Sequence, residues 1–275
     1  MWTLTGFADE ISPDLDVQLD TLAAEEMRYL ELRGVWGTNV LKLSGEQVAR
    51  VKAELAARGV GVSAIGSPIG KIGIQDDFAP HLADFRRALD LAHTLGAPSI
   101  RLFSFFIPHG DDPATHRVAV LDRLGQIVRA AEGSGIVLLH ENEKEIYGDT
   151  PERCHDILAT LDSPILRAAW DPANFVQCGV RPHTAGYELL RPYIAYVHVK
   201  DAILGTGQVV PAGEGDGEVR DTLAALRDSG FDGFFSLEPH LSSGGRFSGF
   251  SGPDLFRTAA RAFKGLLREQ GIAFA

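Results

Sequence analysis

The amino-acid sequence predicts an α/β fold, a single (β/α)8 TIM barrel that spans residues 1–275. Three observations predict it. Apolar runs of strand length alternate eight times with longer amphipathic stretches, and no linker interrupts the alternation. Eight such units in 275 residues match the usual size of a closed barrel. No Gly-x-Gly-x-x-Gly motif follows the first strand, which argues against a dinucleotide-binding sheet.

Each expected strand is a short apolar run that ends at polar or charged residues. A continuous aliphatic run that follows glycine, as in residues 135–139, is typical of a parallel strand covered on both faces. The expected strands are residues 4–7, 28–32, 61–65, 98–103, 136–141, 166–171, 194–198 and 234–238.

Capping signals set the expected helix boundaries. Ser12 is the expected N-cap of the first helix, with Pro13 at the first helical position. Ser44 and Gln47 form a capping box, and Gly59 ends the same helix. The expected helices are residues 13–22, 45–58, 78–95, 113–132, 151–161, 184–190, 219–229 and 254–269.

Two glycine-rich segments are expected to form loops at the mouth of the barrel. We expect residues 213–217 to be a mobile loop over the mouth. Residues 242–249 belong to the last such loop, where barrels often bind phosphate, and Arg246 with the serine and glycine amides suits that use. A solvated turn is the alternative for this segment.

Charge and composition exclude several classes of function. The net charge is −11, and no Lys/Arg-rich run appears, so a nucleic-acid partner is not expected. No apolar run approaches the length of a membrane span, and the N-terminus lacks a signal-peptide pattern. Cys154 and Cys178 are the only cysteines and form no Cys-x-x-Cys pair. They indicate a reduced compartment, so we expect a cytoplasmic protein without a membrane partner.

Four successive strands end in side chains that can bind a metal: Glu141, Asp171, His198 and Glu238. Because alternate residues of a strand face the same side, these side chains should converge at the barrel mouth. Taken alone, Asp171 could instead be the N-cap of a helix. Three carboxylates and an imidazole crowded in a low-dielectric cleft need a cation. The oxygen-rich set favours one divalent ion, Mn²⁺ or Mg²⁺, with Co²⁺, Fe²⁺ or Zn²⁺ also compatible.

The segments around these residues resemble the signature elements of a known family. They are His140-Glu141-Asn142, Trp170-Asp171-Pro172-Ala173-Asn174, Val197-His198-Val199-Lys200-Asp201 and Leu237-Glu238-Pro239. As a set, over nearly the whole chain, they resemble the xylose-isomerase-like barrels known as sugar phosphate isomerases/epimerases, which include ketohexose 3-epimerases and inosose dehydratases. The resemblance implies that the four matching positions hold one divalent metal, often manganese. It also implies that Glu141 and Glu238 are the catalytic acid/base pair.

The chemistry expected of such a site is proton abstraction next to a carbonyl. A metal-bound ketose or related sugar derivative loses a carbon-bound proton to one glutamate, giving a metal-bound enediolate, and the other glutamate returns a proton. Return to the opposite face gives an epimer, and return to the neighbouring carbon gives an isomer. Loss of a β-hydroxyl instead makes the enzyme a dehydratase of a keto-inositol or keto-sugar. A non-catalytic sugar-binding barrel is a further alternative, although both glutamates are present.

Other polar residues near the strand ends are candidates for binding a small-molecule sugar. The candidate substrate-binding residues are Lys200, His240, Asn174, Glu143 and Ser67, each with the alternative of a solvated or supporting group. Glu31 and Arg33 are expected to pair with each other at the end of the second strand. A homo-oligomer that pairs through an exposed loop such as 103–109 is compatible with the sequence.

A DNA-repair nuclease is a rival from another class, because endonuclease IV shares this barrel and the strand-end ligands. Its three-zinc site needs additional histidines. Here Asn174 stands three residues after Asp171, Ser67 and Phe103 stand at other strand ends, and no Asp-x-His pair follows Asp201. The negative net charge also argues against a phosphate-backbone partner.

Overall fold

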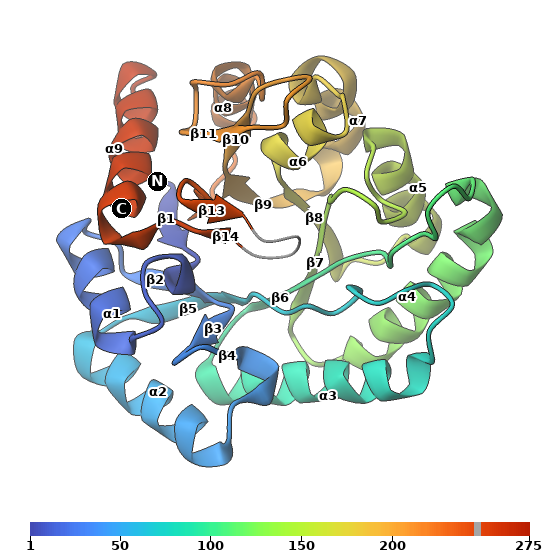
Figure 1. Cartoon of the computed structure of the whole chain (residues 1–275), viewed down its shortest axis with the longest axis horizontal. Helices are drawn as coiled ribbons and strands as arrows, with labels where there is room; N and C mark the ends of the chain where they lie inside the picture. Colours follow the sequence, from blue (N-terminus) through green and yellow to red (C-terminus); the bar gives the residue numbers. More distant parts are fainter. Residues whose placement is uncertain (245–248) are drawn as a thin grey trace.

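Eight parallel strands form the centre of the computed structural model, which describes residues 1–244 and 249–275 (Figure 1). Their order in the sheet is β1-β12-β9-β8-β7-β6-β5-β2. A single backbone bridge from Phe7 to Glu31 joins the two outer strands, so the barrel is nearly closed and the predicted fold class is confirmed. The strands are β1 (Thr3–Gly6), β2 (Tyr29–Leu32), β5 (Gly61–Ile65), β6 (Ser99–Leu102), β7 (Val137–Glu141), β8 (Leu166–Trp170), β9 (Ile194–Val199) and β12 (Phe234–Leu237).

Helices surround this barrel, as Figure 1 shows. Most of the core lies between the strands and the helices, where Phe235 of the sheet packs against Phe263 of the last helix with ring centroids 5.7 Å apart. The helices are α1 (Leu15–Ala24), α2 (Gly45–Arg58), α3 (Phe78–Leu95), α4 (Arg117–Ala131), α5 (Pro151–Leu161), α6 (Pro172–Gln177), α7 (Glu188–Leu190), α8 (Val219–Asp228) and α9 (Gly252–Glu269).

The capping signals locate most helix ends correctly. The Ser44 hydroxyl accepts from the Gln47 amide at 3.2 Å, the Gln47 side chain accepts from the Ser44 amide at 2.8 Å, and Gly59 follows α2 with φ +65°. The predicted N-cap of α1 is wrong. Asp14, and not Ser12, accepts from the Val17 amide at 3.1 Å, and the Ser12 hydroxyl accepts from the Asp14 amide.

The connection from β8 to β9 differs most from the prediction. A short helix, α6, starts directly after β8, where the sequence offered a helix only as the alternative in which Asp171 is an N-cap. The helix expected at 184–190 is a π-helical turn at His183–Tyr187 followed by the three residues of α7. The first helical residue of α6 is Pro172, and proline at this position is a sequence signal for a helix start. The signal stands directly after the end of an expected strand, so no helix was assigned to these residues.

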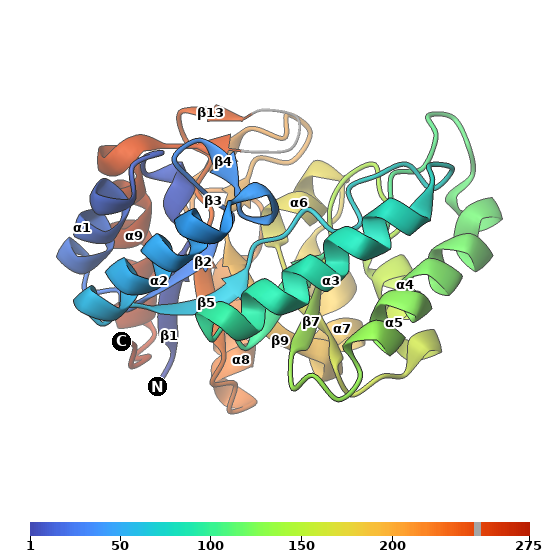
Figure 2. The ribbon, with the colours of Figure 1, turned by 90° about the horizontal axis from the view of Figure 1, so that it is seen from below.

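The loops after the strands gather at one end of the barrel, and Figure 2 shows the hairpin of β3 (Gly34–Val35) and β4 (Thr38–Asn39) at this end, as well as β13 (Ser243–Gly244). The expected mobile loop at 213–217 is held by hydrogen bonds instead. The buried carboxylate of Asp201 accepts from the amides of Gly213, Gly215 and Gly217 at 2.8–3.1 Å. Arg246, the expected phosphate ligand, lies outside the described residues. Among the described residues, no helix is long and apolar enough to cross a bilayer.

Candidate metal centre

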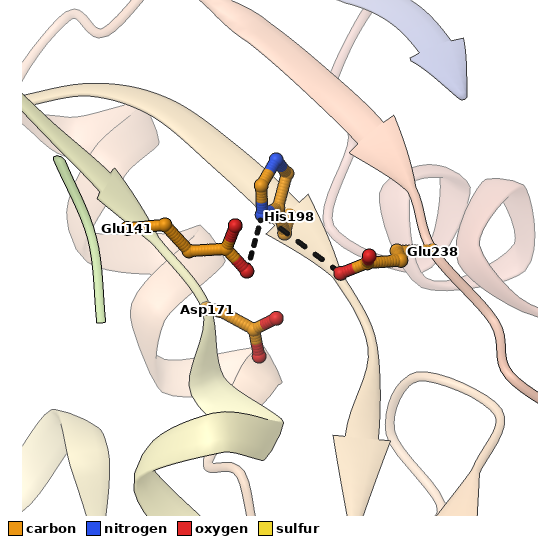
Figure 3. A group of neighbouring side chains, drawn as sticks. All are labelled: Glu141, Asp171, His198 and Glu238. Atoms are coloured by element: carbon orange, nitrogen blue, oxygen red, sulfur yellow. Dashed lines mark ion pairs between the residues drawn. The ribbon is translucent and has the colours of Figure 1, made fainter. Parts of the chain in front are cut away.

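The structure brings Glu141, Asp171, His198 and Glu238 together at the carboxyl ends of β7, β8, β9 and β12 (Figure 3). One potential ligand atom from each of the four side chains lies within 4.8 Å of all the others. All four residues are buried. Their convergence, expected from strand parity, is therefore a feature of the structure, and their roles stay a prediction.

His198 is oriented by carboxylates on both sides of its ring. Its Nδ1 lies 3.1 Å from Glu141 Oε1 and 4.0 Å from Glu238 Oε2, and its Nε2 lies 3.2 Å from Glu31 Oε2. The Tyr196 hydroxyl donates to the same Glu31 oxygen at 3.0 Å. Burial acts to lower the pKa of His198, but Glu141 and Glu31 outweigh it and raise the pKa well above its usual range. A metal ligand at Nδ1 would have to replace the proton there, and the proton that stays on Nε2, donated to Glu31, holds the tautomer in which Nδ1 faces the other predicted ligands.

Asp171 is the N-cap of α6 and also lies in the group of predicted metal ligands, the two alternatives that the sequence offered. Its Oδ1 accepts from the Asn174 amide at 2.9 Å and caps α6. Its Oδ2 lies 2.8 Å from Lys200 Nζ but makes no hydrogen bond to the described residues. Burial raises the pKa of Asp171, although the Lys200 ammonium acts in the opposite direction.

Lysine and arginine side chains already lie among these carboxylates. The expectation of a metal rested on the four predicted ligands alone. Lys200 Nζ is 3.0 Å from Glu238 Oε2, Arg33 Nη1 is 3.1 Å from Glu238 Oε1, and Arg101 Nη1 is 3.0 Å from Glu141 Oε2. Burial acts to raise the pKa of Glu141, and His198 with Arg101 outweighs it and lowers the pKa. Lys200 likewise lowers the pKa of Glu238 against the effect of burial. Lysine and arginine cations therefore offset part of the negative charge of these carboxylates, and a metal ion is not the only group that can do so.

The donor set still fits a divalent ion. Two buried atoms of the group, Asp171 Oδ2 and His198 Nδ1, have no hydrogen-bond partner among the described residues. The carboxylates around the site outnumber the lysine and arginine cations by three, so a divalent ion that takes the place of the proton on His198 would reduce the imbalance. The carboxylates are those of Asp9, Glu10, Glu31, Glu141, Asp171 and Glu238, and the cations are Arg33, Arg101 and Lys200.

Among the predicted substrate-binding residues, Asn174 and His240 contact the predicted ligands, as Lys200 does. Asn174 Nδ2 donates to Glu141 Oε1 at 3.2 Å, and the residue is buried. His240 Nε2 lies 3.0 Å from Glu10 Oε1 and 3.4 Å from Glu238 Oε1. Asn174 therefore orients a ligand, whereas His240 is half-buried at the mouth.

The other predicted substrate-binding residues are placed differently. Glu143 lies at the rim, with Oε2 3.4 Å from Lys71 Nζ. Ser67 is fully buried, and its hydroxyl donates to the Arg101 carbonyl and accepts from the Ile69 amide at 3.3 Å. The geometry gives no support to a substrate contact by Ser67. Lys200, the remaining candidate, bridges two predicted metal ligands as described above.

The sequence did not identify the charged groups that come from the first half of the barrel. The expected pair of Glu31 with Arg33 is wrong, because Glu31 faces His198 whereas Arg33 donates to Asp9 at 2.8 Å and to Glu238. The available signal was parity: a charged residue inside an apolar strand, such as Arg101, faces the barrel interior. The loop 103–109 begins with the buried Phe103, so this end of it is not the exposed pairing surface that was expected.

Comparisons with known proteins identify the family and the fold. Residues 9–271 match the family model described as xylose isomerase-like TIM barrel. The chain is 32% identical over 195 residues to a 2-epi-5-epi-valiolone 7-phosphate 2-epimerase of an Actinoplanes species, which covers 70% of this chain and 70% of that protein.

Solved structures show the same fold at low sequence identity. A D-tagatose 3-epimerase-like protein has a TM-score of 0.79, 18% identity and 97% coverage of each chain. IOLI protein with a bound zinc atom has a TM-score of 0.77, 16% identity and coverage of 97% and 98%. The probable 3-DHS dehydratase AsbF of Bacillus anthracis has a TM-score of 0.74, 19% identity and coverage of 96% and 98%. The chain belongs to the xylose isomerase-like TIM barrel family.

Proposed function

We propose that this chain is a divalent-metal-dependent isomerase or epimerase, which acts on a sugar or sugar derivative by proton abstraction next to a carbonyl. The observation that carries the proposal is the convergence of Glu141, Asp171, His198 and Glu238 within 4.8 Å. The epimerase name of the relative and the zinc in one similar structure support it. We expect Mn²⁺ as the ion, held by these four residues.

A bound divalent ion would polarise the substrate carbonyl and make the neighbouring carbon-bound proton more acidic. The residues of the chain supply the remaining chemistry. His198 and Arg101 lower the pKa of Glu141, and Lys200 lowers the pKa of Glu238, so both side chains are in the carboxylate form that a general base requires. Lys200 also places a positive charge where negative charge develops on substrate oxygens.

A dehydratase is the second candidate. The half-buried His240, 3.4 Å from Glu238, is a further acid that could protonate a leaving hydroxyl, and Glu10 orients its ring. A similar structure carries the name of a dehydratase.

Solvent exchange tests both functions in one experiment. Metal-stripped and Mn²⁺-reconstituted protein is incubated in D₂O with ketoses, keto-inositols and 3-keto sugars, and NMR detects deuterium on carbon. Metal-dependent labelling is expected, and Glu238→Gln should abolish it. The labelled carbon distinguishes an epimerase from an isomerase, and loss of water identifies a dehydratase. Absence of labelling with stoichiometric metal bound would contradict proton abstraction and favour a sugar-binding protein.

A further inference from the structure

A cavity of about 410 Å³ opens beside the metal centre, over the ends of β2, β5 and β6. Three cationic side chains line it, Arg33, Lys71 and Arg101, against one carboxylate, Asp9. Arg33 and Arg101 also contact Glu238 and Glu141, so the cavity and the metal centre share walls. A ligand in the cavity would therefore lie next to the metal centre, on the other side of Arg33 and Arg101.

The cationic groups are held in place by aromatic rings. The guanidinium groups of Arg33 and Arg101 both lie 4.7 Å from the centroid of the Phe7 ring. Lys71 Nζ lies 4.2 Å from the centroid of Phe103, and both phenylalanines are fully buried. Because these cations are already ordered, a bound anion would lose less free energy to the ordering of side chains.

The charges of the side chains that line the cavity indicate which class of ligand it binds. The lining itself holds three cations and one carboxylate, although Arg33 and Arg101 also pair with Glu238 and Glu141 of the metal centre and Lys71 pairs with Glu143. Arg101 Nε is buried and has no hydrogen-bond partner among the described residues. Guanidinium and ammonium donors that converge on one cavity are the groups that bind phosphate or carboxylate oxygens.

We propose that this cavity binds an oxyanion group of the substrate, so that the enzyme acts on an anionic sugar derivative, a phosphate ester or a carboxylate. The proposal rests on the proposed function, because the metal centre must act on the carbonyl end of the same molecule. Arg33, Lys71 and Arg101 bind the anionic end. The exposed ring of Phe250 lines the cavity beside them as an apolar wall.

Two variants alter the charge of the cavity without touching the four predicted metal ligands. Lys71→Gln removes a cation from the rim. Asn39→Asp adds an anion on the lining and keeps the cap of the following turn, since the Asn39 side-chain oxygen accepts from the Leu41 amide at 3.0 Å and aspartate caps equally well. Lys144→Gln is the matched control: Lys144 also lies near Glu143, but it pairs with Gln177 outside the cavity.

The Mg²⁺-loaded protein is titrated with inorganic phosphate and with acetate, and NMR chemical shifts of labelled protein report binding. We expect Lys71→Gln and Asn39→Asp each to raise the dissociation constant for the preferred anion roughly tenfold, and Lys144→Gln to leave it unchanged. Tighter binding of phosphate identifies a phosphate ester, and tighter binding of acetate identifies a carboxylate.

Failure of this inference is separable from failure of the proposed function. If neither anion binds, or if Lys71→Gln behaves like Lys144→Gln while Asn39→Asp has no effect, the anion site is overturned. The exchange experiment is therefore run with neutral ketoses and with their phosphate and carboxylate derivatives. Labelling of either set without anion binding would overturn only the inference. Anion binding without labelling of either set would overturn the proposed function, and with it the assignment of the bound anion to a substrate.

Discussion

The ring of His198 shows how single residues prepare the metal centre. Glu31 contacts Nε2 on one side, and Nδ1 faces Glu141 and Glu238 on the other. A carboxylate that accepts from the second nitrogen of a ligating histidine fixes both the tautomer and the ring orientation. With a metal bound at Nδ1, Glu31 would act on it through His198, as a positioning residue.

Glu31→Gln is expected to weaken divalent-metal affinity by roughly 10–100-fold, because an amide holds the histidine tautomer less firmly than a carboxylate. Competition of the protein with a chromogenic chelator for Zn²⁺ measures the change. Glu143→Gln, at the rim and outside the ligand group, is the control and should leave the affinity unchanged. Equal affinities in wild type and Glu31→Gln would show that Glu31 does not position His198.

Lys200 competes with a metal for two of the predicted ligands, since its ammonium lies 2.8 Å from Asp171 and 3.0 Å from Glu238. Lys200→Met should lower the free energy of unfolding of the metal-free protein by about 3–5 kcal/mol, because buried carboxylates lose their partner. A divalent ion should restore stability more strongly than in wild type. Thermal unfolding with EDTA and with Mg²⁺ tests this, and a variant that Mg²⁺ stabilises no more than wild type would contradict it.

The helix boundaries are predicted correctly where a capping residue or a turn in the local sequence fixes them. The expected bounds 78–95 are those of α3, and Thr150 with Pro151 begins α5 as expected. The first helix shows the limit of such rules. Ser12, Pro13 and Asp14 all favour a helix start, and only the fold of the preceding turn decides that Asp14 is the cap.

Substitutions at these two positions test that assignment. Asp14→Ala should lower the free energy of unfolding by about 1 kcal/mol, since the Val17 amide loses its acceptor. Ser12→Ala should cost clearly less, because its hydroxyl accepts only from the Asp14 amide in the turn. Urea unfolding of both variants gives the comparison. The larger loss in Ser12→Ala would support the original sequence prediction instead.

At the scale of the whole molecule, stability depends on pH through groups that the barrel buries. The His81 side chain of α3 accepts a hydrogen bond from the Gly70 amide at 2.7 Å. This bond holds the loop after β5 against α3. Burial lowers the pKa of His81, with Asp84 and Arg123 acting in opposite directions. Below the usual pKa of about 6.5, the unfolded chain therefore binds a proton that the folded chain resists binding.

The folded state should consequently lose stability as the pH falls below about 6.5, and His81→Gln should remove part of this slope. A glutamine oxygen can still accept from Gly70, so folding is expected to persist. Urea unfolding between pH 7.5 and pH 5 measures the slopes (roughly the range in which a histidine titrates). The exposed His109→Gln is the control with an unchanged slope. An unchanged slope in His81→Gln would exclude this histidine as the cause.

The sequence by itself determined the barrel and the convergence of four side chains, because both depend on local periodicity. Strand parity and the common direction of parallel strands place Glu141 and Glu238 at one mouth, whatever the details of packing. Only the tertiary structure decided what surrounds them. Arg33, Arg101 and Glu31 reach the centre from the first half of the barrel. Strand parity indicates which of them face the interior, but it does not indicate which partner each contacts, because the partners lie far apart in the chain.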